Sequence, residues 1–434
     1  MPYQKSTKLP GEFASKLGHL GVVQDPFIKE LLSQFESREN PTAEERGATS
    51  HKIESNENEV CNFILAFDGS ISTIPNGLAE HKKISYINVA TICLDMHEMR
   101  EANKPIVDPF FVKDLLKKNS DTMVAALPLS GFYIKGKTIS ESIREAIFHQ
   151  IKRYIDGQII DTLKFLIYRE WNPNYVVTES FDCIHENCGF KVSLPKGQIE
   201  FDCPKCKKAL NLIDYIGILS QVNDESNSES IAVDMMNLLE HTLIFYYLRN
   251  LPNYTNDRVL LIKDGPLMLR AQYARLVQAM RDFLEHFYQT KRSVAVVGVE
   301  KTGSYVDHIP LLRDCLTEPG QIFIPDHEYR NTYIKNSGPS SQDNRDRSTY
   351  GAKVYFKADS TSVFVLNIPT GGFRENPTPA DLKNLKEICS TLPELKSYQF
   401  ENSLAPIAAA HRIASMSMYP SNAILERFTK DTIR

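Results

Sequence analysis

Three apolar runs in the chain each end at an acidic residue. The runs are NFILAF before Asp68, RVLLIK before Asp264 and VAVVGV before Glu300. A run of Phe, Ile, Leu and Val of this length is typical of a strand that is buried on both faces. The sequence therefore predicts a central sheet in which strands from distant parts of the chain carry carboxylates at their ends, where these side chains converge.

Strand and helix patterns alternate along most of the chain. The first strand is expected to end at Asp68. A second strand at 84–94 is expected to pair with it as a hairpin, because Asn76-Gly77 supplies a turn signal between them. The alternation predicts an α/β fold with a mixed sheet flanked by helices. Further helices are expected within 137–171, 231–249, 268–289 and 404–418, and further strands at 258–263, 293–299, 352–358 and 362–368.

The start of the chain differs in composition from the rest. Residues 24–38 carry helical spacing, whereas residues 39–58 are polar and charged, as in a linker. We therefore expect an N-terminal helix and linker over 1–58 and a main domain over 59–434. A cysteine-rich insertion over 181–210 is expected to lie within that domain.

Charge and hydropathy exclude some classes of protein. The formal net charge is −4, from 50 basic and 54 acidic residues, so a nucleic-acid partner would need a local basic patch or metal ions that neutralise the acidic residues. No run of ~18 consecutive apolar residues predicts a membrane span, and the N-terminus lacks the apolar core of a signal peptide. With no disulfide framework, these features favour the cytoplasm.

Glu240 is the most informative acidic residue, because it lies on the apolar face of a predicted helix with Met236, Leu243 and Ile244. A buried carboxylate without a partner costs several kcal/mol, so it is expected to bind a metal ion, take up a proton or form an ion pair with a Lys or Arg. Asp-Gly pairs such as Asp68-Gly69 are also common in turns. A metal site and a set of turn and ion-pair residues therefore both remain open.

A two-metal site needs several carboxylates, so that two divalent ions ~3.5–4 Å apart can clamp a phosphodiester. Asp68, Glu240 and Asp264 would supply three of them, and their oxygen ligands suit Mn²⁺ or Mg²⁺. Lys301 follows the third strand, where its charge can contact a phosphate. His411, flanked by alanines, is a candidate metal ligand or proton shuttle. The order of residues that defines a P-loop is absent, so ATP hydrolysis of that type is not expected.

Four cysteines form a local cluster in the sequence. Cys183 and Cys188 precede Cys203 and Cys206, a spacing that suits a tetrahedral Zn²⁺ site of four thiolates, as in a zinc ribbon. A redox-active CxxC pair is the alternative. A ribbon of this size folds only with its metal. Its role, in contacts with nucleic acid or with a partner protein, is left open by the sequence.

The order of these motifs over residues 61–420 resembles the NurA nuclease family. The resemblance rests on FDGS at Asp68, a helix carrying Glu240, DGPL at Asp264, a lysine after the next strand at Lys301, and an AAHR helix at His411. It implies an RNase H-like (Piwi-like) core in which Asp68, Glu240, Asp264 and His411 are catalytic and metal-binding, with Lys301 as an accessory. The cysteine insertion departs from the simplest pattern of the family.

The resemblance also carries expectations about activity and partners. It implies a DNA nuclease that uses Mn²⁺ or Mg²⁺, with 5′-to-3′ exonuclease and single-strand endonuclease activity. It further implies a homodimer and a hexameric HerA-type ATPase as partner, in DNA repair or anti-phage defence. Two other functions remain open: a non-catalytic zinc-ribbon protein that binds nucleic acid or protein, and another RNase H-like phosphotransferase that acts on RNA or in strand transfer.

Overall fold

The chain divides into two compact units, Met1–Pro41 and Thr42–Arg434. In the first unit, α1 (Gly18–Gln24) is followed by α2 (Pro26–Ser33), which begins with a side-chain cap: Asp25 accepts hydrogen bonds from the backbone N–H groups of Phe27 and Ile28. The computed structural model describes residues 18–35, 40–47, 50–76, 79–102, 119–220, 222, 229–251, 257–270, 273–290, 293–335, 345–397, 403–416 and 421–432.

The segment that the sequence predicted as a linker, 39–58, contains regular structure. It includes α3 (Ala43–Gly47) and β1 (Ser50–Lys52), and β1 pairs antiparallel with β11 (Gln321–Phe323) at one edge of the main sheet. The expected division after residue 58 therefore lies inside the second unit. Hydropathy does not reveal β1, because short edge strands commonly carry polar and charged side chains that face solvent.

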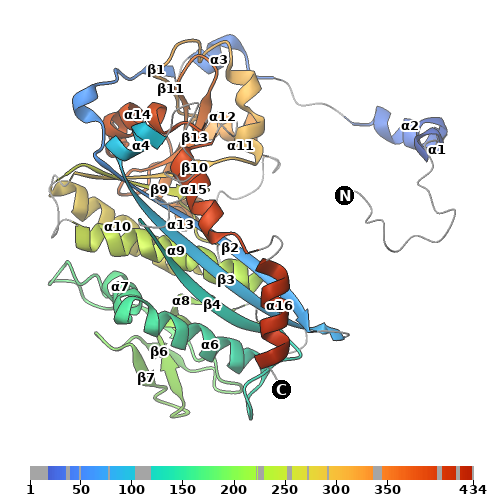
Figure 1. Ribbon diagram of the computed structural model, residues 1–434, viewed down its shortest axis with the longest axis vertical. Coiled ribbons are helices and arrows are strands. Elements are labelled where there is room, and N and C mark those ends of the chain that lie inside the picture. The colour runs from blue at the N-terminus through green and yellow to red at the C-terminus, as the bar shows by residue number, and fades with distance from the viewer. Residues whose placement is uncertain are drawn as a thin grey trace. The chain divides into compact units, whose positions relative to one another are not determined.

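The second unit is built on a mixed sheet of nine strands, in the order β1-β11-β12-β13-β10-β9-β2-β3-β4 (Figure 1). The pairs β2–β9 and β9–β10 are parallel, and the other neighbours are antiparallel. The predicted mixed α/β fold is confirmed at this level. The remaining strands of the sheet are β2 (Phe63–Asn76), β3 (Ala79–Asp95), β4 (Ser120–Ser130), β9 (Val259–Asp264), β10 (Val294–Glu300), β12 (Gly351–Lys357) and β13 (Val363–Pro369).

The first strand is longer than the sequence predicted. β2 does not end at Asp68 but continues to Asn76, and β3 pairs with it antiparallel along this whole length, as the predicted hairpin requires. Asp68-Gly69 is therefore part of a strand and not a turn. By contrast β9 ends at Asp264 as expected, and Gly265 turns the chain with a φ of +90°, a conformation that glycine adopts without strain.

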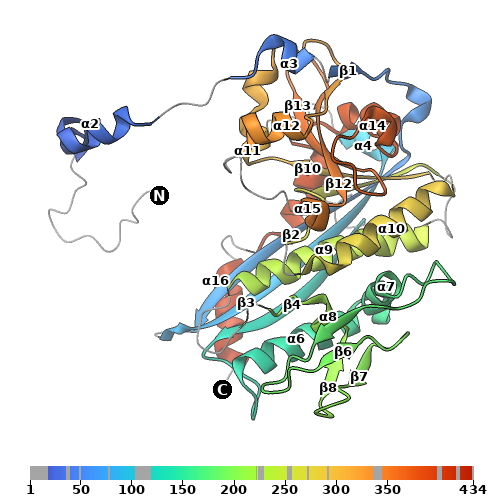
Figure 2. The same cartoon turned by 180° about the vertical axis from the view of Figure 1, so that it is seen from behind.

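Helices cover both faces of the sheet (Figures 1 and 2). One apolar cluster joins alternate strand residues such as Leu261 to α6 (Ile139–Arg153), α7 (Gln158–Ile167), α9 (Ser230–Asn250) and α10 (Arg275–Gln289). A second cluster joins the intervening residues, such as Ile262, to α14 (Leu385–Thr391) and α15 (Ala405–Ala414). These two faces are called the α9 face and the α15 face below. The other described helices are α4 (Met96–Ala102), α8 (Leu212–Ile216), α11 (Ser304–Asp307), α12 (His327–Tyr329), α13 (Arg345–Ser348) and α16 (Ser421–Thr432).

The outer edge of β4 is closed by side chains of α6 and the residue that follows it. The Gln150 side chain accepts a hydrogen bond from the Ala126 N–H at 2.8 Å and donates one to the Ala126 carbonyl at 3.0 Å. The Tyr154 hydroxyl donates to the Val124 carbonyl at 2.5 Å, and Pro128 has no N–H to offer. Side chains therefore take the place of a further strand along this part of the edge.

The cysteine insertion consists of two small hairpins, β5 (Ser180–Asp182) with β6 (Lys191–Ser193) and β7 (Glu200–Asp202) with β8 (Ala209–Asn211). It packs on the rest of the unit, because Phe181 and Val192 are buried in the cluster of the α9 face. The Tyr168 hydroxyl, just after α7, lies 2.6 and 2.7 Å from the Pro195 and Gln198 carbonyl oxygens, which share its one proton. The insertion is therefore a fixed part of the fold.

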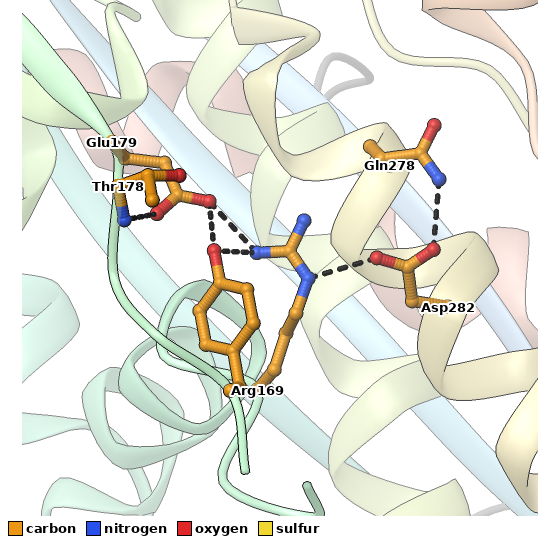
Figure 3. A network of polar contacts seen from close by, with 6 residues as sticks. Arg169, Thr178, Glu179, Gln278 and Asp282 are labelled. Carbon is orange, nitrogen blue, oxygen red and sulfur yellow. Dashed lines mark hydrogen bonds and ion pairs between the residues drawn. The ribbon is translucent and has the colours of Figure 1, made fainter.

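Arg169 connects the segment that leads into this insertion with helix α10 (Figure 3). Its guanidinium donates to Asp282 on α10 at 2.8 Å, and to the Tyr175 hydroxyl and Glu179 at 2.6 and 2.9 Å. Gln278 donates to the other oxygen of Asp282 at 2.7 Å. This network fixes Glu179, directly before β5, against the main helical layer. Among the described residues, no helix is both long and apolar enough to span a bilayer.

Candidate functional site

Asp68 and Asp264 lie side by side on adjacent parallel strands. The pairing of β2 with β9 stops one residue before each aspartate, so the two occupy the next position along both strands. Residues two positions earlier, Ala66 and Ile262, belong to the apolar cluster of the α15 face. Because side chains alternate along a strand, both carboxylates point to that face, with their strands ~4.8 Å apart. The predicted convergence of these two residues is therefore found.

Each aspartate has a polar partner that reaches solvent. His411 on α15 donates its Nδ1–H to Asp68 Oδ2 at 2.8 Å, and its side chain is 60% exposed. Lys301, directly after β10, donates to Asp264 Oδ2 at 2.9 Å, with 31% of its side chain exposed. Burial raises the pKa of Asp68 and nearby Asp264 raises it further, while His411 and Lys301 oppose the shift. The two carboxylates therefore act on each other across a short distance.

Glu240 approaches the same place from the opposite face of the sheet. It lies on α9 and is only 4% exposed, as its apolar neighbours predicted. Its Oε2 is 2.8 Å from Nζ of Lys263, a buried lysine on β9. Burial raises the pKa of Glu240, and Lys263 opposes the shift; Asp68 and Asp264 add to it. The ion pair considered for Glu240 is thus present, and all three carboxylates act on one another.

Gly69 allows α9 to approach this closely. A Cβ atom at Gly69 would lie 2.7 Å from Glu240 Oε1 and 2.5 Å from Cγ of Met236. The glycine of the FDGS motif is therefore required by packing against α9. Only a hydrogen fits between β2 and this helix.

We expect Gly69→Ala to displace α9 and to destabilise the protein by about 1–3 kcal/mol, the usual cost of overpacking a core. Denaturant unfolding of the variant measures this loss. Gly21→Ala on α1 is the matched control, because a Cβ there meets nothing within 4 Å. Equal stability of the Gly69 variant and the wild type would contradict the close approach.

The third acidic strand end has a separate role. Glu300 pairs with Lys353 on β12 and accepts a 2.6 Å hydrogen bond from Asn367 on β13. Asn367 pairs with Gly298 across the strands, so this group lies on the α9 face, away from the aspartates. Only two of the three acidic strand ends therefore share a site.

The four cysteines of the insertion come together. The Sγ atoms of Cys183, Cys188, Cys203 and Cys206 all lie within 4.8 Å of one another, with the pairs Cys183–Cys206 and Cys188–Cys203 at 3.8 and 3.7 Å. A tetrahedron with metal–sulfur bonds of ~2.3 Å has edges of ~3.8 Å, so the four thiols could hold a metal such as zinc. Among the described residues, this is the only group of three or more His, Cys, Asp or Glu whose ligand atoms are gathered so tightly.

Two features next to Glu240 were not predicted from the sequence: the buried Lys263 and the contact between His241 and Tyr350. His241 is fully buried, and its Nδ1 is 2.5 Å from the hydroxyl of Tyr350, which precedes β12. That contact fixes the turn of α9 that carries Glu240. A signal for Lys263 was present: a lysine within the buried run RVLLIK must find a carboxylate, since an unpaired buried charge is costly.

The chain matches no known protein-family model, and no curated protein matches it either.

Proposed function

We propose that this protein is a metal-dependent phosphodiesterase that cleaves DNA. The observation that carries the proposal is the pair Asp68 and Asp264, side by side at the end of two parallel strands on the α15 face. Two adjacent carboxylates with solvent-reaching partners offer hard oxygen ligands to a divalent cation, and a site of this kind activates water and neutralises charge on a phosphoryl group.

The two aspartates are better placed than Glu240 to bind such a cation. Asp68 and Asp264 would hold it, because His411 binds Asp68 through Oδ2 and the lysine on Asp264, Lys301, is exposed enough to move aside. Their oxygens do not form a compact set with Glu240, since the described acidic residues form no group as tight as that of the cysteines. Glu240 lies on the α9 face, where it is paired with Lys263.

His411 and Lys301 have distinct roles in this proposal. Nδ1 of His411 is bound to Asp68, so the other ring nitrogen, Nε2, can exchange a proton with water or with the leaving oxygen. Lys301 carries a positive charge at the edge of the site, where it can contact a phosphate oxygen.

The motif order leads us to propose membership of the NurA nuclease family, with an RNase H-like core. The antiparallel β2–β3–β4 meander next to two parallel strands is compatible with such a core. On the same basis we propose 5′-to-3′ exonuclease and single-strand endonuclease activity with Mn²⁺ or Mg²⁺. A homodimer, a HerA-type hexameric ATPase as partner, and a structural Zn²⁺ in the insertion complete the proposal.

A second candidate is a non-catalytic protein that binds nucleic acid or protein through its cysteine insertion. One observation favours it: each carboxylate of the acidic group already has a partner, in His411, Lys301 or Lys263. In that case the group is a set of ion pairs that stabilises the centre of the sheet.

Cleavage assays decide between the two. Labelled single-stranded DNA, double-stranded DNA and RNA should be incubated with the full chain, with and without Mn²⁺. We expect cleavage of DNA only with the metal. DNA bound but left intact under all metal conditions would favour the non-catalytic candidate, and cleavage of RNA alone would favour another RNase H-like phosphotransferase.

A further inference from the structure

A hollow lined by basic side chains lies on the α9 face of the sheet and is called the cationic hollow below. Its volume is about 430 Å³, which includes a mouth that is open to solvent. Lys353 on β12 lies on this face, because the next residue, Val354, belongs to the apolar cluster of the α15 face. None of the described residues that line the hollow is acidic, and four are basic: Arg281, Arg330, Lys353 and Arg374. Since Lys353 is paired with Glu300, the three arginines are the groups best suited to bind an anion.

Two of these arginines are buried and held in place. Arg281 on α10 is 3% exposed and donates a hydrogen bond to the carbonyl oxygen of Thr349. Arg330, in a π-helical turn, is 2% exposed and donates to the carbonyl oxygens of Pro325 and Glu375, the second at 2.7 Å. Carbonyl oxygens are neutral, so these bonds orient the guanidinium groups and do not cancel their charge. Guanidinium groups fixed in this way match the geometry of phosphate oxygens.

A glycine-containing loop directly after β13 forms one wall of the hollow. It comprises residues 370–374, TGGFR, and contributes Phe373 and Arg374 to the lining. Gly371 has a φ of +75°, and a Cβ atom there would collide with Glu285 on α10. Only glycine therefore lets the loop lie against this helix. The close approach sets where Phe373 and Arg374 lie.

Phe373 and Arg374 make the exposed side of the hollow different from its interior. Phe373 is 37% exposed and lies over Arg281, with 5.0 Å between the guanidinium carbon and the ring centroid. The Arg374 side chain is 50% exposed and lies 3.4 Å from Asp381. Surface pairs of this kind contribute little to stability, so Arg374 can turn towards another anion. The hollow thus combines buried guanidinium groups with an accessible aromatic ring and an arginine beside it.

We propose that the cationic hollow binds the terminal phosphate of a nucleotide, with the base stacked on Phe373. A terminal phosphate enters end-on and carries about two negative charges at neutral pH, which suits several arginines. An internal phosphodiester carries one charge and is flanked by chain on both sides, so it reaches Arg330 less easily. A free nucleotide and the phosphorylated 5′ end of a DNA strand present the same group. Because the hollow and the two aspartates lie on opposite faces of the sheet, this inference does not rest on the proposed function.

Calorimetric titration of the full chain with thymidine 5′-monophosphate, thymidine and inorganic phosphate tests the inference. No divalent metal is added, so phosphate binding through a metal at the acidic group does not contribute. The Kd of the monophosphate should be at least ~10-fold lower than that of thymidine or of phosphate, because stacking and phosphate contacts then act together. Arg374→Gln should weaken binding of the monophosphate by about tenfold. Phe373→Leu should weaken it by about tenfold and leave the binding of inorganic phosphate unchanged.

Arg427→Gln is the matched control. Arg427 on α16 is an exposed arginine paired with an aspartate, Asp431, as Arg374 is with Asp381. This variant should bind the monophosphate as the wild type does, and circular dichroism should show that all the variants are folded. A wild type that binds neither phosphate nor the monophosphate would overturn the proposal. Binding that is unchanged in both Arg374→Gln and Phe373→Leu would do so too, because the ligand then lies elsewhere.

Oligothymidylate with and without a 5′-phosphate separates the two sources of the group. A preference for the phosphorylated strand that is lost in Arg374→Gln assigns the hollow to a DNA end. Binding of the monophosphate without such a preference assigns it to a free nucleotide. Either result supports the site.

Discussion

Replacing Asp264 by asparagine is expected to lower metal-dependent DNA cleavage by at least ~10³-fold, because loss of a charged ligand removes both the cation and its stabilisation of the transition state. Asparagine keeps the shape of the side chain, so Lys301 still has an oxygen to which it can donate. The rate should be measured at saturating Mn²⁺ and DNA, with folding checked by circular dichroism.

Asp68→Asn should have a similar effect on cleavage. It should not lower the free energy of unfolding at neutral pH. Burial raises the pKa of Asp68 in the folded state. The folded protein therefore binds this proton more tightly than the unfolded chain, and the ionised carboxylate opposes folding at neutral pH. Lowering the pH through the raised pKa removes that opposition. At pH 7, Asp68→Asn should thus unfold no more easily than the wild type.

Asp307→Asn is a suitable control for both variants. Asp307 lies on α11, six residues after Lys301 in the sequence. It makes no described contact with the acidic group. Its activity should equal that of the wild type. A cleavage rate that survives in both Asp68→Asn and Asp264→Asn would exclude this site as the catalytic centre.

Loss of one thiol from the four-cysteine site is expected to have the second large effect. Cys203→Ser should lower the midpoint of thermal unfolding by on the order of 10 °C, because structural Zn²⁺ contributes many kcal/mol to small domains and part of this is lost with one ligand. The effect should extend beyond the insertion, since Phe181 and Val192 are buried in the cluster of the α9 face.

Elemental analysis and calorimetry check this result together. The wild type should carry about one zinc per chain, and Cys203→Ser should carry less. Cys93→Ser is the matched control, because Cys93 is an exposed cysteine on β3, outside the insertion. A Cys203 variant with full zinc content and unchanged stability would show that the four thiols are not a structural metal site.

The sequence predicted the features that depend on local pattern. Apolar runs identified β2, β9 and β10, and the apolar neighbours of Glu240 indicated its burial. The approach of Asp68 to Asp264 followed from the tendency of acidic strand ends to converge. Cysteine spacing predicted that four thiols gather, because two cysteine pairs at this separation suit one tetrahedral site whatever the surrounding fold.

Features that depend on which strands and helices lie next to each other were not predictable from local sequence pattern. The continuation of β2 past Asp68 depends on its pairing with β3, and glycine after Asp68 was read as a turn although it makes room for Met236 and Glu240. The pairing of Lys263 with Glu240 needs the register of α9 against β9. Glu300 has the same sequence context as the aspartates, and only its neighbours on β12 and β13 separate it from them.

The closed edge of β4 limits how copies of this protein can associate. An open strand edge invites another chain to add to the sheet, and repeated addition leads to fibres. Here the Gln150 side chain satisfies both backbone groups of Ala126, and the Tyr154 hydroxyl satisfies the carbonyl of Val124. A continuous intermolecular sheet through this part of the edge is therefore disfavoured.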